Sequence, residues 1–238
     1  MKNYFLLLLL SILFFASCKN KENTKVEKKW QAVGIDISEF QGNIDWQKLI
    51  NQKNYKLKFI FIRATMGKDR KDNSFTKNLT EAKKHNILIG SYHYYDPNEN
   101  SVLQAKNYLK NSSQNDCHIL PVLDIEKTSK IQSKEKLLIG VKKWLDIVEK
   151  ETGHKPIIYT GLSFYKDNFN GKKEFSDYPK WIAAYSDGRA NDEHVINAHI
   201  RQFSESLWIK GVKKNVKIDG NVIFDSLKFK EIIKPVYR

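Results

Sequence analysis

Two carboxylates stand two positions apart at the end of an apolar run. The segment "PVLDIE", residues 121–126, carries Asp124 and Glu126 where a buried strand would end. An unpaired buried charge is costly, so acids at such a point are either paired structurally or used in chemistry. Side chains repeat every two residues along a strand, which places both carboxyl groups on one face, about 6.5 Å apart.

Two acids at this distance in a low-dielectric cleft can hold different protonation states. Their repulsion raises one pKa, which leaves one protonated acid and one carboxylate. Cleavage of a glycosidic bond needs this pair, because the leaving oxygen must be protonated and an oxocarbenium-like centre must be stabilised. Asp-x-Glu also occurs by chance, so the positions of other acids must support this interpretation.

Apolar segments that predict strands alternate with amphipathic segments that predict helices. Eight strands are predicted, at residues 32–37, 57–65, 87–95, 117–126, 155–161, 180–186, 198–204 and 217–224. Helical patterns follow the first five, and Asp45 and Ser74 are the expected N-cap residues of the first two helices. The longest helix follows Ser133 and ends at Gly153. The helical pattern fades after a short helix near Phe164.

This order of elements predicts one α/β domain. Apolar strands that alternate with helices imply a parallel sheet covered by helices. About eight strands in one domain favour a TIM-like barrel, and the missing late helices make it irregular. An open doubly wound sheet is the alternative. It would usually carry a Gly-rich phosphate loop after its first strand, where this chain has "DISEFQGN".

The acids fall where such a barrel places functional side chains, at the C-terminal ends of its strands. Asp36 ends the first predicted strand, Asp124 and Glu126 end the fourth, and Asp219 lies in the last. Aromatic rings that suit the apolar faces of sugars lie at or near the strand ends as well: Tyr92, Tyr94, Tyr159, Trp181 and Tyr185.

A metal site is the competing interpretation of clustered carboxylates, since hard cations take oxygen ligands. His93 could join such a site, but no second histidine stands at a metal-ligand spacing. We therefore expect no metal, and His93 is interpreted as a hydrogen-bonded wall residue.

The N-terminus has the pattern of an export signal. Lys2 precedes an apolar run that ends in Ala16-Ser17-Cys18, and this run is too short for a comfortable membrane-spanning helix. We predict a bacterial lipoprotein signal peptide at 1–17, a lipidated Cys18 with a polar tether at 18–29, and a catalytic barrel at 30–238. An ordinary signal peptide with an incidental cysteine is the alternative. The predicted location is the cell envelope, anchored to the outer membrane and facing the periplasm or the exterior.

The chain is strongly basic, with a formal net charge of +14. Basic proteins bind polyanions, but export argues against nucleic acid, and the scattered lysines are typical of a solvated surface. Attraction to an anionic envelope is a secondary expectation. With Cys18 lipidated, Cys117 would be the remaining thiol, which excludes an internal disulfide and leaves it as a small buried hydrophobe.

Several motifs together resemble one enzyme family. The segment "GIDISEFQGNIDW" (34–46) is similar to the opening signature of family 25 glycoside hydrolases, the N-acetylmuramidase lysozymes. The resemblance continues in order through "FIRATMG" (61–67), "GSYHYY" (90–95), "PVLDIE" (121–126), "PIIYTG" (156–161), "WIAAYS" (181–186), "RQFS" (201–204) and "IDGNVIF" (218–224). It covers about residues 30–224.

The resemblance implies a flattened (β/α)5(β)3 barrel and hydrolysis of the β-1,4 bond between N-acetylmuramic acid and N-acetylglucosamine in peptidoglycan. It implies that Glu126 is the general acid and that Asp124 stabilises the charged intermediate or orients the substrate acetamide. Asp36 and Asp219 would complete the acidic cluster. The resemblance implies that Tyr92 and Tyr94 line the sugar site, and we predict His93, Tyr159, Tyr185 and Gln202 as further substrate-binding residues. No metal or organic cofactor is implied, and a monomer is expected.

Three positions depart from the family's usual pattern. Met66 stands where a Glu is usual, Arg63 where Lys is frequent, and Gly220 where Leu is common. Met66 favours one alternative, a non-catalytic lipid-anchored wall-binding protein. The other alternative is a chitinase-like glycosidase, which also carries an Asp-x-Glu pair at its fourth strand.

Overall fold

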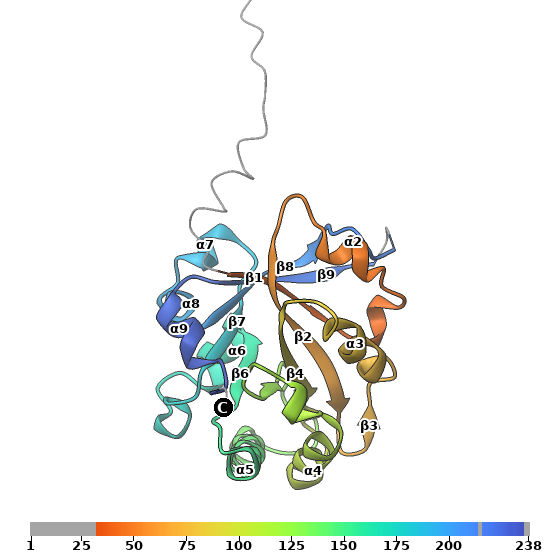
Figure 1. Cartoon of the computed structure of the whole chain (residues 1–238). Coiled ribbons are helices and arrows are strands. Elements are labelled where there is room, and N and C mark those ends of the chain that lie inside the picture. Colours follow the sequence, from red (N-terminus) through yellow and green to blue (C-terminus); the bar gives the residue numbers. More distant parts are fainter. Residues whose placement is uncertain (1–31, 214–215, 236–238) are drawn as a thin grey trace, which may run out of the picture.

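A closed ring of eight strands forms the centre of the molecule (Figure 1). The structure is a computed structural model that describes residues 32–213 and 216–235. The ring runs in the order β1-β9-β8-β7-β6-β5-β4-β2, and pairing of β1 with β2 closes it. Its strands are β1 (Ala32–Ile37), β2 (Leu57–Met66), β4 (Leu88–Tyr94), β5 (Val122–Asp124), β6 (Ile157–Gly161), β7 (Lys180–Ala183), β8 (Ile200–Leu207) and β9 (Ile218–Ile223). A two-residue strand, β3 (Arg70–Lys71), pairs with the end of β2.

Seven of these strands are parallel, and β9 is antiparallel to both of its neighbours. The C-terminal ends of the seven and the start of β9 therefore lie at the same end of the barrel, which we call the mouth. The predicted irregular TIM-like α/β barrel is confirmed, and the open doubly wound sheet is excluded by the β1–β2 pairing.

Helices follow the first five barrel strands, which gives the five predicted β/α units. They are α2 (Trp46–Ile50), α3 (Phe75–Ala82), α4 (Ser101–Asn111), α5 (Lys134–Thr152) and α6 (Leu162–Asn168). Figure 1 shows α3, α4 and α5 outside the ring of strands. Shorter elements are α7 (Asp187–Ala190), α8 (Glu193–Ile196), α9 (Ser226–Glu231) and the 3-10 turns η1 (Glu39–Gln41), η2 (Gln114–Asp116) and η3 (Lys173–Phe175).

The predicted helix ends agree with the structure at three of four positions. Asp45 caps α2, Ser133 caps α5, and Gly153 ends α5 with a φ of 71°. Ser74 precedes α3, but its side chain makes no capping bond. Asp72 instead accepts a hydrogen bond from the backbone N–H of Ser74 at 2.9 Å.

Side chains divide between the barrel interior and the layer under the helices. The interior holds large rings from β2 and β7, among them Phe59, Phe61 and Trp181. Glycine makes room for two of them: a Cβ on Gly34 would lie 2.3 Å from the Phe59 ring, and one on Gly90 2.4 Å from the Phe61 ring. These two positions must stay without side chains for the interior to pack.

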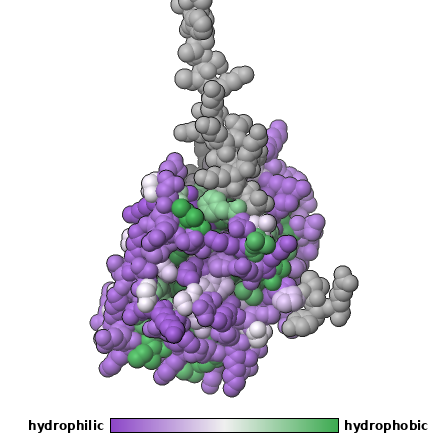
Figure 2. Space-filling model, turned by 90° about the vertical axis from the view of Figure 1, so that its left-hand side faces the viewer, coloured by the Kyte–Doolittle hydropathy of each residue, from purple (hydrophilic) through white to green (hydrophobic). Residues whose placement is uncertain are grey.

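Some features differ from the sequence-based expectation. β5 ends at Asp124, so Glu126 lies beyond the strand, and α7 to α9 were not predicted because helices of four to six residues carry almost no periodic pattern. Within the two described ranges no helix is long and apolar enough to cross a membrane. The predictions for residues 1–17, Cys18 and 18–29 lie outside the described residues. Figure 2 shows one face of the molecule, largely hydrophilic with small separate hydrophobic patches.

Candidate active site

A cleft of about 220 Å³ opens at the mouth of the barrel. Residues that alternate inward along the strands line it, since side chains two positions apart share a face. The lining includes all four predicted acids and several of the predicted tyrosines, namely Asp36, Asp124, Glu126, Asp219, Tyr92, Tyr94 and Tyr159, together with Phe40, Gln41, Arg63 and Trp181. The structure thus brings the predicted acids together in one site.

Asp124 and Glu126 form a coupled pair in this cleft. Asp124 is buried and Glu126 is exposed, and both line the cleft. The two carboxyl groups hydrogen-bond to each other, which requires one proton between them. Burial first, and then the negative charges of Glu126 and Asp36, raise the pKa of Asp124 well above its usual range.

The position of the shared proton follows from the two environments. Burial also raises the pKa of Glu126, but the hydrogen bond with Asp124 and the charge of Lys127 lower it. These causes favour the protonated form of Asp124 over that of Glu126 in the free protein. Oδ1 of Asp124 is buried and meets no hydrogen-bond donor in the described part of the chain, so it can accept one from a ligand.

Asp36 and Asp219 form a second pair across the β1–β9 junction, where they are direct partners. Asp36 is buried and accepts hydrogen bonds from Gln202 at 3.0 Å and from Asn221 at 2.7 Å. Burial and the neighbouring charge of Asp219 raise the pKa of Asp36. Burial also raises the pKa of Asp219, to about 6. Asp219 reaches the mouth because β9 runs in the opposite direction and begins there.

Gln202 lies behind Asp36 rather than in the cleft, and it is only 2% exposed. The hydroxyl groups of Tyr159 and Tyr185 each donate to its Oε1 at 2.8 Å. Its amide then donates to Asp36. The side chain of Gln202 positions Asp36, and its predicted role in substrate binding stays a prediction. Tyr185 is 43% exposed.

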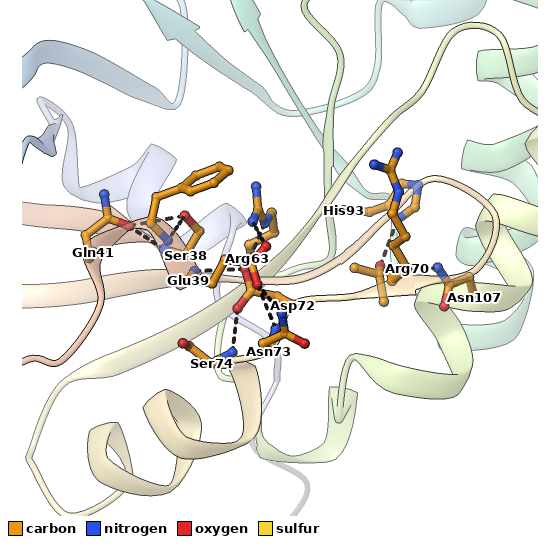
Figure 3. Close-up of polar contacts among 12 residues, drawn as sticks. Ser38, Glu39, Gln41, Arg63, Arg70, Asp72, Asn73, Ser74, His93 and Asn107 are labelled. Carbon is orange, nitrogen blue, oxygen red and sulfur yellow. Dashed lines mark hydrogen bonds and ion pairs between the residues drawn. The ribbon is translucent and has the colours of Figure 1, made fainter.

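His93 is fully buried on the outer side of β4 (Figure 3). Its ring nitrogens bond Thr65 at 2.7 Å and Gln104 at 3.1 Å, and the ring stacks on Trp144 with centroids 5.5 Å apart. Burial lowers the pKa of His93 to about 4, so the ring is neutral. Alternation directs His93 away from Tyr92 and Tyr94, which line the cleft, and its predicted role in substrate binding stays a prediction. His93 is hydrogen-bonded on both ring nitrogens, but it does not line the cleft.

Sequence reasoning missed two polar side chains of the site. Asn221 connects Trp181, whose Nε1 donates to it at 2.9 Å, with Asp36. Its signal was its position, two residues after Asp219 in the same strand. Arg63 lies in the cleft and forms ion pairs with Asp72 at 2.9 Å and Glu39 at 3.0 Å (Figure 3).

Met66 and Gly220 depart from the family's usual pattern, and neither position changes the lining of the cleft. Met66 is half-buried at the end of β2 and does not line the cleft. A Cβ on Gly220 would lie 2.8 Å from the ring of Phe203, so this ring fills the space that a larger residue would need. Cys117 is free and buried, as predicted.

Over residues 32–213 and 216–235, no three His, Cys, Asp or Glu residues gather in a way that could hold a metal.

The fold and the site together define a class of protein. An α/β barrel with a proton-sharing Asp-x-Glu pair at its mouth, beside a second acid pair and tyrosine side chains, has the parts that glycoside hydrolysis requires. A sequence model of Glycosyl hydrolases family 25 matches residues 35–212. The chain belongs to this family, and it is a glycoside hydrolase.

Known proteins show the same relationship. The chain is 38% identical over 191 residues to YegX of Escherichia coli K12, covering 79% of this chain and 68% of that protein. It is 28% identical over 187 residues to the autolytic lysozyme of Clostridium acetobutylicum, covering 78% of this chain and 54% of the lysozyme. A family 25 glycosyl hydrolase structure from Bacillus anthracis superposes with a TM-score of 0.74 at 24% identity, covering 86% of this chain and 94% of that one.

Proposed function

We propose that the enzyme is a lysozyme that cleaves the β-1,4 bond between N-acetylmuramic acid and N-acetylglucosamine in peptidoglycan. The observation that carries this proposal is that Asp124 and Glu126 line the same cleft at the mouth of the barrel, beside Asp36 and Asp219. The similarity to an autolytic lysozyme supports the choice of substrate. Peptidoglycan glycan strands are the proposed partner, and the enzyme acts as a monomer.

The proposed reaction begins when the substrate binds. The N–H of the substrate acetamide donates a hydrogen bond to Asp124, whose buried Oδ1 meets no donor in the described ranges of the free protein. This new donor stabilises Asp124 as a carboxylate, and the shared proton moves along the hydrogen bond to Glu126. Glu126 then gives the proton to the glycosidic oxygen, which leaves with the bonding electron pair as a hydroxyl group.

The acetamide oxygen attacks the anomeric carbon as the leaving group departs. The positive charge that develops is stabilised by the Asp124 carboxylate, at the opposite end of the acetamide. A water molecule then attacks the same carbon, loses a proton to Glu126, and opens the cyclic intermediate. Asp36 and Asp219 supply further negative charge to the cleft, which favours the cationic transition state.

Digestion of purified peptidoglycan tests the proposal. The wild type should release fragments with new muramic acid reducing ends, detected by mass spectrometry, and Glu126→Gln and Asp124→Asn should not. Glu174→Gln is the control, since Glu174 is an exposed acid in η3 away from the cleft. Equal activity of all four proteins would refute the proposed roles. Digestion of chitin oligomers in place of peptidoglycan would favour the chitinase-like alternative.

The acetamide step has its own test. Attack by the acetamide and then by water inverts the anomeric carbon twice, so the first-formed product should be the β anomer. NMR of the fresh digest follows both anomers before they equilibrate. An α anomer as the first product would exclude acetamide assistance and leave a direct attack by water.

We also propose that the enzyme works from the envelope, anchored through a lipid on Cys18. The sequence pattern of residues 1–18 is the support for this location. The anchor holds the domain close to its substrate, so that cleavage does not depend on free diffusion to the wall.

A further inference from the structure

An exposed aromatic side chain stands at the rim of the cleft. Phe40 lies in η1, just after β1, and it lines the cleft with 72% of its surface open to solvent. A single exposed apolar residue is ordinary on a protein surface, so exposure alone assigns no role. The contacts on either side of Phe40 and beneath its ring are the informative features.

The backbone is fixed on both sides of this ring. Ser38 and Gln41 form a reciprocal capping box, in which the Ser38 N–H donates to Gln41 at 2.7 Å. The Gln41 amide also donates to the carbonyl of Lys217 at 2.9 Å, which joins η1 to the segment before β9. The Glu39 N–H donates to Asp72 at 3.0 Å. Phe40 therefore stands on a rigid turn, which reduces the entropy that a ligand contact would cost.

The Arg63 guanidinium group, which is fixed by ion pairs, contacts the Phe40 ring. The Arg63 guanidinium carbon lies 4.8 Å from the Phe40 ring centroid. Arg63 is buried and held by ion pairs to Asp72 and Glu39, and Glu39 also accepts a hydrogen bond from Asn73 (Figure 3). The guanidinium therefore holds the ring by a cation–π contact. Most of the ring surface remains open toward solvent and the cleft.

The volume of the cleft indicates which ligand could contact the open surface of the Phe40 ring. Pockets that enclose drug-sized ligands measure about 300–1,000 Å³, and this cleft measures about 220 Å³. A glycan strand of several sugars therefore extends beyond it onto the rim. Around the ring, β2 and β4 separate β1 from β5, so Phe40 and Glu126 approach the cleft from different sides.

We infer that Phe40 is a sugar-binding platform for a ring of the glycan strand beyond the two sugars joined by the cleaved bond. The axial C–H groups of a pyranose form an apolar face that stacks on an aromatic ring, and Phe40 offers such a ring already fixed in place. This inference rests on the proposed function, because it takes the glycan strand as substrate.

Oligosaccharide binding to a variant that cannot cleave its substrate tests whether Phe40 is a sugar-binding platform. In a Glu126→Gln background, calorimetry compares a disaccharide with a hexasaccharide of alternating N-acetylglucosamine and N-acetylmuramic acid. Phe40→Ala and Phe40→Leu should weaken hexasaccharide binding about 5- to 10-fold and leave disaccharide binding unchanged, while Phe40→Tyr keeps both affinities. Leu227→Ala is the matched control, since Leu227 is 64% exposed in α9, which follows β9 at the end of the barrel opposite the mouth.

Each other outcome is decisive. Unchanged hexasaccharide binding in Phe40→Ala overturns the inference, and equal weakening of both ligands overturns it as well, because the ring would then act on the reacting sugars. Phe40→Leu retains an apolar side chain without a ring, so retained affinity in that variant refutes stacking. A wild type that leaves peptidoglycan intact refutes the proposed function together with the platform. If the wild type digests peptidoglycan but Phe40→Ala leaves hexasaccharide binding unchanged, the platform alone is refuted.

Discussion

Four carboxyl groups meet in surroundings that oppose their ionisation. Burial is the first cause of the raised pKa at Asp36, Asp124, Glu126 and Asp219, and neighbouring acids add to it at Asp36, Asp124 and Asp219. Strongly shifted carboxyl groups in one cleft are typical of catalytic sites. The same repulsion costs stability, so neutralising one acid should stabilise the fold while it removes function.

Asp219→Asn tests this cost. Its pKa of about 6 exceeds the value in the unfolded chain, so folded wild type binds more protons between about pH 4 and 6 and loses stability as pH rises through that window. Above pH 6 the Asp219→Asn variant does not lose this stability, because its amide side chain cannot ionise. Because Asp219 is only half-buried, we expect a gain of about 1 kcal/mol, or about 2–4 °C in Tm, at pH 7.5. Melting followed by circular dichroism should show no gain at pH 4, and a gain of equal size at both pH values would contradict the linkage.

Lys127 should set the basic limit of activity through Glu126. Its positive charge lowers the pKa of Glu126, so Lys127→Met should raise that pKa and keep the acid protonated to higher pH. Since Lys127 is exposed, screening keeps the shift small, roughly 0.3 pH unit in the basic limb of kcat, which reports the substrate complex in which Glu126 holds the proton. Lys130→Met, an exposed lysine in the same loop, is the control. A shift to lower pH in Lys127→Met would contradict the assignment of Glu126 as the proton donor.

At the scale of single residues, the acids and several aromatic residues of the cleft could be predicted from sequence, but the polar side chains that hold the acids in place could not. Acids that end apolar runs are conspicuous, which is why Asp36 and Asp124 could be predicted. The roles of Gln202 and Asn221 depend on which strands become neighbours, and no local pattern encodes that. His93 is buried on the outer side of β4, as its position between Tyr92 and Tyr94 in the strand already indicated.

At the scale of elements, glycines in the strands determine how the barrel interior packs. Gly90→Ala should destabilise the fold by about 1–3 kcal/mol, because its Cβ would lie 2.4 Å from the Phe61 ring. Gly188→Ala should be neutral or slightly stabilising, since a Cβ there meets nothing within 4 Å and the residue lies in helix α7. Urea denaturation measures both changes.

A double variant tests whether the Phe61 ring causes the loss of stability expected for Gly90→Ala. Phe61→Leu removes the atoms nearest to the new methyl group, so Gly90→Ala combined with Phe61→Leu should cost less than the sum of the two single changes. Additive costs would mean that Gly90 is required for another reason.

Element boundaries were predictable where the pattern was long. β1 was predicted at its observed bounds, and β2, β4 and β6 within two residues, because apolar runs with polar flanks define buried strands. The fourth predicted strand was seven residues too long, since Ile119 makes only an isolated bridge with Ile233 and the chain leaves the sheet after Asp124. Local composition does not tell a paired apolar segment from an unpaired one.

At the scale of the whole molecule, topology placed the last acid. Sequence alone does not reveal that β9 runs opposite to its neighbours, because a strand reads the same way in either direction. That reversal brings the start of β9 to the mouth and Asp219 opposite Asp36. The five β/α units could be predicted from alternation and the barrel from the number of strands, but the flattened (β/α)5(β)3 form was implied by family resemblance.

The same topology orients the molecule relative to its proposed anchor. The described chain begins at Ala32, at the start of β1, while Asp36 at the other end of β1 lies in the mouth. The chain therefore enters the barrel at the end opposite the cleft. The eleven residues 19–29 span at most about 40 Å when fully extended. An anchor on Cys18 would keep the domain near the membrane and leave the mouth free to face the wall.

Cys18→Ser tests this arrangement in the full-length chain. Without the thiol no lipid can be attached, so the protein should move from the membrane pellet to the soluble fraction, and labelled fatty acid should no longer be incorporated. Activity on soluble peptidoglycan fragments should stay unchanged, because the cleft is built from residues 36–219 and the anchor lies outside it. Activity on intact cell walls should fall, since the enzyme is no longer held beside them. Cys117→Ser is the matched control, as its thiol is buried inside the domain. A membrane-bound Cys18→Ser protein would refute the anchor and favour an ordinary signal peptide with an incidental cysteine.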